Sequence, residues 1–286
     1  MLSGEPDYLQ LWKELARTGR GRSPSSFSYF DNKEKAEAFD AASRQKNRGR
    51  QDILLDVVKR ELKPEDTVID IGAGTGRWSI PLAEIAAQVT AVEPARSMSD
   101  VLVRNADEAG VRDKITLVHE TWETADVGIH DIVVSFHSMY MSADLAAFVR
   151  KMEAHASRCC YMGIRHFRID GIIQELSAKV HGTRHDSTNF VIAYNALYQM
   201  GIYANVFMED FRRSWTDPTL ETAFARAKRH LHIEDETAYD DLVRDTLERR
   251  LTHEGSSYRW PDSMTTALVW WRPSQSTTEL NQVTVQ

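Results

Sequence analysis

Short apolar runs and amphipathic stretches alternate along the middle of this chain. The apolar runs are rich in Val, Ile and Ala, which is typical of buried parallel strands. The stretches between them have the apolar spacing of helices that cover one face of a sheet. We predict strands at 67–71, 88–92, 115–118, 131–136 and 159–164, with helices near 76–87, 96–109 and 142–156. Strands that alternate with helices in this order predict an α/β fold with a doubly wound, mostly parallel sheet.

The two flanks of this alternating region have a different pattern. Ahead of it, we predict a linker rich in Gly, Ser, Pro and Arg at 18–28, and helices at 7–17, 33–47 and 50–62. Behind it, we predict helices at 168–181 and 189–200, a strand at 202–208, a charged helical segment at 217–251 and a last strand at 264–271.

These elements divide the chain into three predicted parts. Residues 1–50 form an N-terminal helical lid and linker, residues 51–272 form one domain, and residues 273–286 form a polar tail that we expect to be disordered. Within the domain, helical cap insertions are expected at about 167–200 and 211–254. Ligands of open α/β sheets bind beyond the carboxyl ends of the strands, so both insertions are expected beside the substrate.

Composition and charge exclude several classes of protein. A formal net charge of −7 gives no overall basic field that would favour nucleic acid as a partner. No run of about 18 apolar residues is present, so we expect no membrane span, and the N-terminal residues lack the apolar stretch of a secretory signal. The only two cysteines, Cys159 and Cys160, are neighbours in a predicted strand and point to opposite faces. No disulfide is therefore expected, and the cytoplasm is the predicted compartment.

Three glycines, Gly72, Gly74 and Gly76, follow the first predicted strand and lead into a helix. Glycines are needed where the backbone turns sharply and a ligand approaches without a Cβ in the way, so this unit predicts nucleotide binding. Asp70 comes just before the turn. The dinucleotide fingerprint has its third glycine where this chain has Arg77, which argues against an NAD-dependent oxidoreductase.

A second acidic residue, Glu93, ends the next predicted strand, about 20 residues after the glycine turn. A carboxylate at this place accepts hydrogen bonds from both ribose hydroxyls of an adenosine. NAD-binding domains use the same device, so Glu93 alone leaves the two classes of cofactor open.

The Asp-x-Gly-x-Gly-x-Gly spacing, taken with Glu93, resembles motif I of class I S-adenosylmethionine (SAM)-dependent methyltransferases. The run from Glu93 to Met98 is similar to the family's acid, small turn residues and a Met against the adenine. Tyr29-Phe30-Asp31 and the later Phe39-Asp40 are similar to a segment that folds over the cofactor as a lid in that family. The resemblance implies SAM as cofactor, S-adenosylhomocysteine as product, and a seven-stranded sheet whose final strand lies antiparallel beside the strand at 159–164.

The resemblance also implies a cofactor site built around the glycine turn. Its predicted members are Tyr29, Phe39, Asp70, Gly72, Ala73, Gly74, Thr75, Gly76, Glu93, Pro94, Met98, Thr121, Trp122 and Ser135. The family often has an acid against the adenine amino group where this chain has Thr121, so that contact departs from the pattern.

The end of the predicted strand at 131–136 points at the methyl group in this family, and here it reads Ser135-Phe136-His137-Ser138-Met139-Tyr140. It lacks the Asn/Asp-Pro-Pro-aromatic run of amino-methylating DNA enzymes. We name His137 and Tyr140 as the candidate catalytic residues. His137 titrates near neutrality, and three roles stay open for it: a base, a positioning group or a residue that fills the pocket. Tyr140 either orients the acceptor or packs in the core.

Two further groups of polar residues follow. Arg165 and His166 end the predicted strand at 159–164 on the same rim, where an arginine suits a carboxylate or phosphate or simply solvates the surface. His181 and His185 have the spacing of a helical metal site, but Gly182 predicts a loop there, so we predict no metal.

The sequence therefore predicts a SAM-dependent methyltransferase that acts on a small or medium-sized molecule through an O, N, S or C acceptor. The alternatives are a non-catalytic SAM-binding protein and an RNA or protein methyltransferase. Neither a nucleic acid nor a membrane is expected as a partner, and the oligomeric state is left open.

Overall fold

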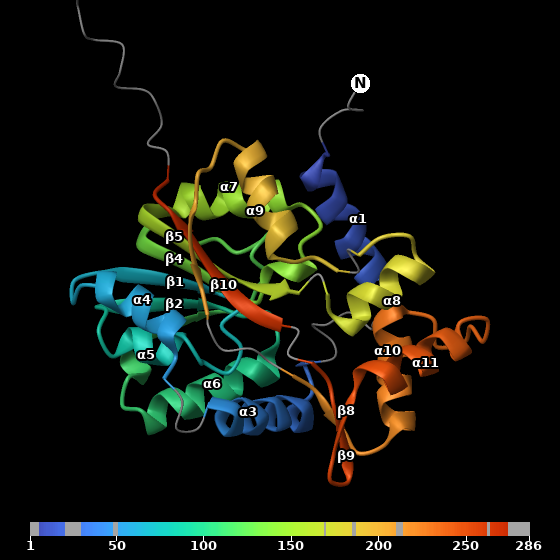
Figure 1. Cartoon of the computed structure of the whole chain (residues 1–286). Helices are drawn as coiled ribbons and strands as arrows, with labels where there is room; N and C mark the ends of the chain where they lie inside the picture. The colour runs from blue at the N-terminus through green and yellow to red at the C-terminus, as the bar shows by residue number, and fades with distance from the viewer. Residues whose placement is uncertain are drawn as a thin grey trace, which may run out of the picture.

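A seven-stranded sheet forms the centre of the computed structural model, with the strand order β3-β2-β1-β4-β5-β10-β6 (Figure 1). The structure describes residues 6–20, 30–47, 51–168, 170–184, 187–209, 214–261 and 264–273. The strands of this sheet are β1 (Thr67–Ile71), β2 (Gln88–Val92), β3 (Ile115–Val118), β4 (His130–Phe136), β5 (Ala156–Phe167), β6 (Asn205–Met208) and β10 (Met264–Trp271).

The neighbouring strands from β3 to β5 are parallel, and β10 runs antiparallel between β5 and β6. This arrangement confirms the predicted fold class and the predicted antiparallel final strand. The apolar runs become strands because helices bury both of their faces, and β-branched side chains fit such a surface.

Helices cover the two faces of the sheet. One face carries α4 (Ile53–Glu61), α5 (Ser79–Ala83) and α6 (Arg96–Glu108), whose apolar residues share one core cluster with the sheet. The other carries α1 (Tyr8–Arg20), α7 (Leu145–His155) and α9 (Phe190–Gln199), which share a second cluster. Outside the first layer, α3 (Lys33–Asn47) packs on α6.

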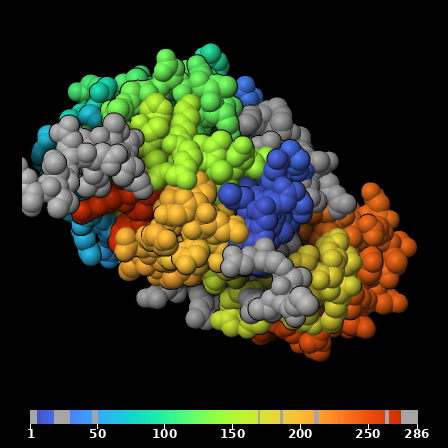
Figure 2. Space-filling view, turned by 90° about the horizontal axis from the view of Figure 1, so that it is seen from above, coloured from blue at the N-terminus to red at the C-terminus, as the bar shows by residue number. Residues whose placement is uncertain are grey.

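A helical lobe with its own small core lies beside the sheet. It contains α8 (Ile172–Val180), α10 (Leu220–Leu231) and α11 (Asp240–Arg250), and a small sheet of β7 (Thr216–Asp217), β8 (Thr252–Glu254) and β9 (Ser257–Arg259) lies next to it. Figure 2 shows this lobe, in orange and yellow, at one end of the molecule beside the blue α1.

The two helices of the predicted cap at 167–200 pack on different parts of the molecule. The apolar face of α8 packs on α10 and α11, whereas α9 packs on β5 and α1. The predicted helical segment at 217–251 is broken, because His232 takes a left-handed conformation (φ 57°) that closes α10. The predicted helix at 76–87 is limited to α5, and two short 3₁₀ helices at Arg112–Lys114 and Met139–Met141 were not predicted.

Two predictions fall largely on residues outside the description, namely the linker at 18–28 and the tail at 273–286. Among the described helices, none combines the length and the apolar character that crossing a bilayer requires.

Candidate functional site

The turn between β1 and α5 lies at the carboxyl edge of the sheet. Gly72, Gly74 and Gly76 all have positive φ, at 72°, 58° and 91°. The amide of Gly72 donates to the carbonyl of Val92 at the end of β2, over 2.8 Å. The turn is therefore held against the neighbouring strand in a conformation that glycine adopts without strain.

Glu93 fastens the same turn from the end of β2. Its Oε2 accepts from the Gly74 amide and its Oε1 from the Ala95 amide, each over 2.9 Å. Burial raises the pKa of Glu93, and the two amide hydrogen bonds oppose that rise. Each carboxylate oxygen retains acceptor capacity for a further donor, such as a ribose hydroxyl.

Asp70 lies beneath the turn and is 2% exposed. Its Oδ2 accepts from the Ser79 hydroxyl over 2.6 Å. Burial raises the pKa of Asp70 to about 6, the charge of Glu93 adds to the rise, and the hydrogen bonds from Ser79 oppose it. Two buried carboxylates close to each other favour a ligand that brings positive charge or hydrogen-bond donors.

Gly74 lies beneath the Met98 side chain in the turn. A Cβ placed on Gly74 would have the Met98 Cε as its nearest neighbour, at 3.6 Å, and the Gly72 carbonyl at 4.0 Å. Met98 is held in place by Ala36 and Phe30 from the α3 side. A methionine over the turn and two buried carboxylates beside it fit the cofactor that the sequence resemblance implies.

Arg77, at the place of the third dinucleotide glycine, is held by contacts with two other elements. Its Nη2 lies 2.7 Å from the Oδ2 of Asp52, which caps α4. Its guanidinium also lies over the Phe136 ring, 5.3 Å from the centroid. The residue therefore ties the turn to α4 and to β4.

The predicted lid segment is joined to the glycine turn through a buried amide. Asn105 Nδ2 donates to Asp40 of α3 over 3.0 Å and to the Thr75 carbonyl over 2.9 Å. Phe39 is 44% exposed and meets the Phe30 ring edge-on at 5.5 Å. Tyr29 lies outside the described residues.

The predicted adenine neighbours after β3 are held by other groups. Trp122 is buried, its ring contacts Phe148, and its Nε1 donates to the Phe148 carbonyl over 3.1 Å. The Thr121 hydroxyl lies 3.3 Å from that of Thr124. The structure thus gives Trp122 a core position against α7, and Pro94 stands half-buried beside Glu93.

The loop after β4 touches the glycine turn through Ser138, which sequence reasoning missed. A Cβ on Gly72 would lie 2.3 Å from the Ser138 Cβ. The Ser138 hydroxyl donates to the Ile71 carbonyl over 2.6 Å, so the Ser135 hydroxyl, 2.7 Å away, donates to Ser138. Serine is common in loops, and no spacing marks this contact in the sequence.

His137 and Tyr140, the two candidate catalytic residues, lie together. Tyr140 Oη accepts from the Arg165 amide over 2.7 Å and is hydrogen-bonded to His137 Nδ1, 2.8 Å away. His137 Nε2 lies 3.4 Å from the Thr266 hydroxyl on β10. Both ring nitrogens thus have partners, and His137 itself has a positive φ of 59°.

Arg165 and His166 diverge at the end of β5. The Arg165 guanidinium lies over the Tyr140 ring, 3.9 Å from the centroid. His166 points to the opposite face, where its ring meets Phe190, and burial lowers the pKa of His166. Only Arg165 of the pair joins the His137–Tyr140 group.

The predicted metal spacing involves His181, whose Nε2 lies 2.8 Å from the Leu231 carbonyl, and His185, which is outside the described residues. Within the described ranges, no three His, Cys, Asp or Glu side chains are arranged to hold a metal ion.

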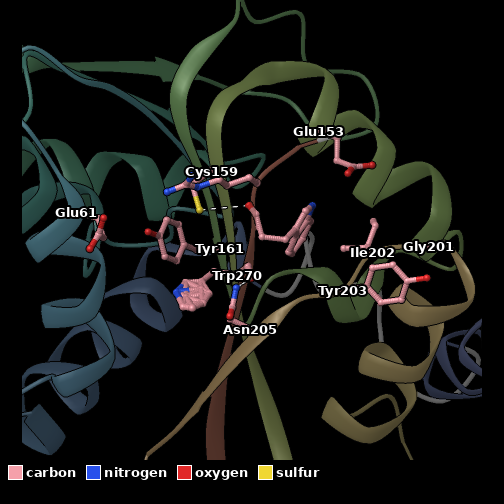
Figure 3. Close-up of a pocket in the computed structure, with 11 residues that line it drawn as sticks. Glu61, Glu153, Cys159, Tyr161, Gly201, Ile202, Tyr203, Asn205 and Trp270 are labelled. Carbon is pink, nitrogen blue, oxygen red and sulfur yellow. Dashed lines mark hydrogen bonds between the residues drawn. The ribbon is translucent and has the colours of Figure 1, made fainter. Parts of the chain in front are cut away.

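A cavity of about 580 Å³ lies at the opposite edge of the sheet (Figure 3). Cys159 and Tyr161 from β5 and Trp270 from β10 line it, and the Cys159 thiol donates to the Trp271 carbonyl over 3.3 Å. Because β10 is antiparallel to β5, its last residues lie at the amino end of β5, away from the glycine turn. This cavity is therefore separate from the candidate site.

Comparison with known proteins gives the chain a family context. A family model described as a methyltransferase domain matches residues 68–158, which include the glycine turn and Glu93. An uncharacterized protein of Haemophilus influenzae is 25% identical over 219 residues, which cover 73% of this chain and 77% of that protein.

A second relative matches a shorter segment of this chain. The mitochondrial ribosomal RNA small subunit methyltransferase of Arabidopsis thaliana is 33% identical over 96 residues, 33% of this chain and 25% of that protein. Among solved structures, a provisionally assigned methyltransferase from Bacillus halodurans superposes with a TM-score of 0.53 at 10% identity, covering 77% of this chain and 99% of that one. That superposition supports the fold alone.

Proposed function

Because this chain belongs to the class I SAM-dependent methyltransferases, we propose that it transfers the methyl group of SAM to a small or medium-sized molecule. The acceptor lies over the carboxyl ends of β4 and β5 in this proposal. One observation carries it. In the loop after β4, Ser138 contacts the glycine turn, and the Tyr140 hydroxyl accepts a hydrogen bond from the Arg165 amide. A continuous row of polar groups thus leads from the cofactor turn to the end of β5.

The residues around the glycine turn take the cofactor in this proposal. Glu93 accepts hydrogen bonds from the ribose hydroxyls, and Met98 lies against the adenine. Asp70, deep beneath the turn, balances the positive charge of the amino-acid end. SAM, when bound, supplies an electrophilic methyl group on a sulfonium.

His137 acts as a positioning residue in this proposal. Its Nδ1 is hydrogen-bonded to Tyr140 and its Nε2 lies near Thr266, so neither nitrogen is directed to an acceptor. Holding Tyr140 fixes one wall of the acceptor site. Methyl transfer demands chiefly that an electron-rich atom be held in line, so a fixed wall contributes through orientation.

Ribosomal RNA is a second candidate acceptor, because the Arabidopsis relative is named as a ribosomal RNA methyltransferase. That match spans a quarter of the relative, and the formal net charge of −7 here weighs against a nucleic acid. A small molecule is therefore the acceptor we propose.

The cofactor half of the proposal is tested by titrating the full chain with SAM, S-adenosylhomocysteine, NAD and NADP in a thermal-shift assay. A ligand that binds only the folded state raises the melting temperature by mass action. We expect stabilisation by the two sulfur nucleotides alone. Glu93→Ala should abolish it, whereas Glu61→Ala, at the opposite-edge cavity, should leave it unchanged.

Stabilisation by NAD or NADP instead would refute the methyltransferase assignment. Turnover is then measured with methyl-labelled SAM against small-molecule extracts and, separately, against ribosomal RNA. Label in RNA alone would replace the small-molecule acceptor by the second candidate. SAM binding with label in neither pool would favour a non-catalytic SAM-binding protein.

A further inference from the structure

Arg165 is held in a defined position at the carboxyl end of β5. Its backbone amide donates to the Tyr140 hydroxyl over 2.7 Å, and its guanidinium lies over the Tyr140 ring at 3.9 Å and the Phe167 ring at 5.9 Å. A guanidinium stacked on aromatic rings keeps its in-plane N–H groups available for a further partner.

No carboxylate of the described residues lies within ion-pair distance of Arg165, and its Nε is buried without a hydrogen-bond partner there. Other partly buried arginines are paired: Arg158 with Asp66 and Arg226 with Asp217. A partly buried charge is normally paired, because it loses hydration without compensation otherwise. Arg165 thus has the features of a group that awaits an anion.

The position of Arg165 joins it to the candidate site. Arg165 lies opposite Thr266 in the register of β5 and β10, and the Thr266 hydroxyl faces His137 Nε2. The amide of His137 donates to the Gly163 carbonyl of β5 over 3.0 Å. The next residue, Ser138, touches the glycine turn, so an anion on Arg165 would lie beside the acceptor position.

The charges around Arg165 from the helical lobe are also basic. Burial and the positive charges of Arg226, Arg229, His232 and Arg165 together lower the pKa of His230 to about 4. The carboxylate of Asp217 is taken by Arg226 and the Trp260 indole. Glu209, directly after β6, donates its amide to the Thr266 carbonyl of β10, so β10 lies between Glu209 and Arg165.

We propose that the methyl acceptor carries a carboxylate group, and that Arg165 binds it at the carboxyl ends of β4 and β5. The inference rests on the proposed function. A carboxylate is favoured over a phosphate because the planar guanidinium, stacked on Tyr140, presents a flat pair of donors that matches a planar acceptor. The Phe167 ring beside Arg165 also favours a flat apolar body next to that carboxylate.

The test uses the full chain loaded with S-adenosylhomocysteine and titrated calorimetrically with 4-hydroxybenzoate, 4-hydroxybenzamide, hexanoate, hexanamide and phenyl phosphate. We expect each carboxylate to bind at least about tenfold more tightly than its amide, and phenyl phosphate more weakly than 4-hydroxybenzoate. Arg165→Gln should remove the difference between acid and amide. Arg165→Lys, which keeps the charge but not the flat fork, should retain only part of it.

Arg168→Gln is the matched control, because Arg168 lies three residues further on and is paired with Asp170 at the surface. It should leave every affinity unchanged. S-adenosylhomocysteine affinity, measured first, should be the same in all variants. If the wild type did not bind S-adenosylhomocysteine, the proposed function itself would be refuted.

With S-adenosylhomocysteine bound, equal affinities for acids and amides, or no binding of either acid, would overturn the carboxylate proposal alone. Preference for phenyl phosphate would overturn it in favour of a phosphorylated acceptor. Retention of the acid preference in Arg165→Gln would assign the carboxylate to another residue.

Discussion

The Cβ of Ser138 lies so close to Gly72 that a Cβ added to the glycine would stand 2.3 Å from it. Real Cβ atoms do not approach to this distance, so residue 72 accepts no side chain while the loop after β4 keeps its place. The conformation of the glycine turn is thus constrained by the loop after β4. This contact brings the two halves of the candidate site together.

Gly72→Ala should therefore destabilise the protein by more than the strain of its positive φ. Gly201→Ala is a matched control, because Gly201 has a similar φ of 79° but nothing within 4 Å of an added Cβ. We expect Gly201→Ala to cost about 1 kcal/mol and Gly72→Ala roughly 1–3 kcal/mol more, measured by urea unfolding. Equal costs would show that the Ser138 contact is absent in solution.

The strands around this contact were predictable from the sequence because β1 and β2 are buried along nearly their whole length, and the edge strand β3 keeps a short apolar and β-branched run. The runs at 67–71, 88–92 and 115–118 match β1, β2 and β3 residue for residue. Strand β5 extends to Ala156–Phe167, beyond both ends of the predicted run, because pairing with β4 begins at Ala156 and pairing with β10 continues to Phe167. No side-chain pattern in the sequence predicts backbone pairing of this kind.

The arrangement of the insertions and of the acceptor edge was less accessible to sequence reasoning. Both α8 and α9 are amphipathic, and periodicity does not say that one packs on the lobe and the other on β5. Likewise, no pattern in the sequence predicts that Trp122 packs against Phe148 of α7. Contacts between residues far apart in the chain decide both questions.

The pH dependence of stability should contain a contribution from Asp70. Its pKa is about 6 in the folded chain and 3.8 in the unfolded one, so the folded state binds the proton more tightly. Stability is therefore highest below the unfolded value and falls as pH rises through about 6. Relative to Asp70→Asn, the wild type should lose on the order of 3 kcal/mol between pH 4 and 7 in urea unfolding.

Taking the difference between the two proteins cancels the other titrating groups to first order. A difference in unfolding free energy that stays constant across this pH range would mean that folding does not raise the pKa of Asp70. The burial that raises its pKa would then be relieved in solution.

The buried amide of Asn105 should couple α3 to the glycine turn. Asn105→Ala removes its hydrogen bonds to Asp40 and Thr75 and leaves a buried carboxylate with fewer partners. We expect a loss of about 1–3 kcal/mol in unfolding free energy and faster hydrogen exchange in residues 33–47. Lys59→Ala, which removes an ion pair with Glu84 outside α3, is the control and should change exchange in these residues little.

Tyr140→Phe should reduce turnover with the acceptor without weakening cofactor binding. The substitution keeps the ring beneath Arg165 but removes the hydroxyl that accepts from the Arg165 amide and bonds His137 Nδ1. His137 then loses the group that holds its ring, while Ser138 and the glycine turn keep their contacts. We expect S-adenosylhomocysteine affinity within about twofold of the wild type and turnover with the acceptor reduced about 10–100-fold, chiefly in kcat. A matched loss of cofactor affinity would instead make Tyr140 part of the support for the glycine turn, and unchanged turnover would show that the hydroxyl has no part in positioning.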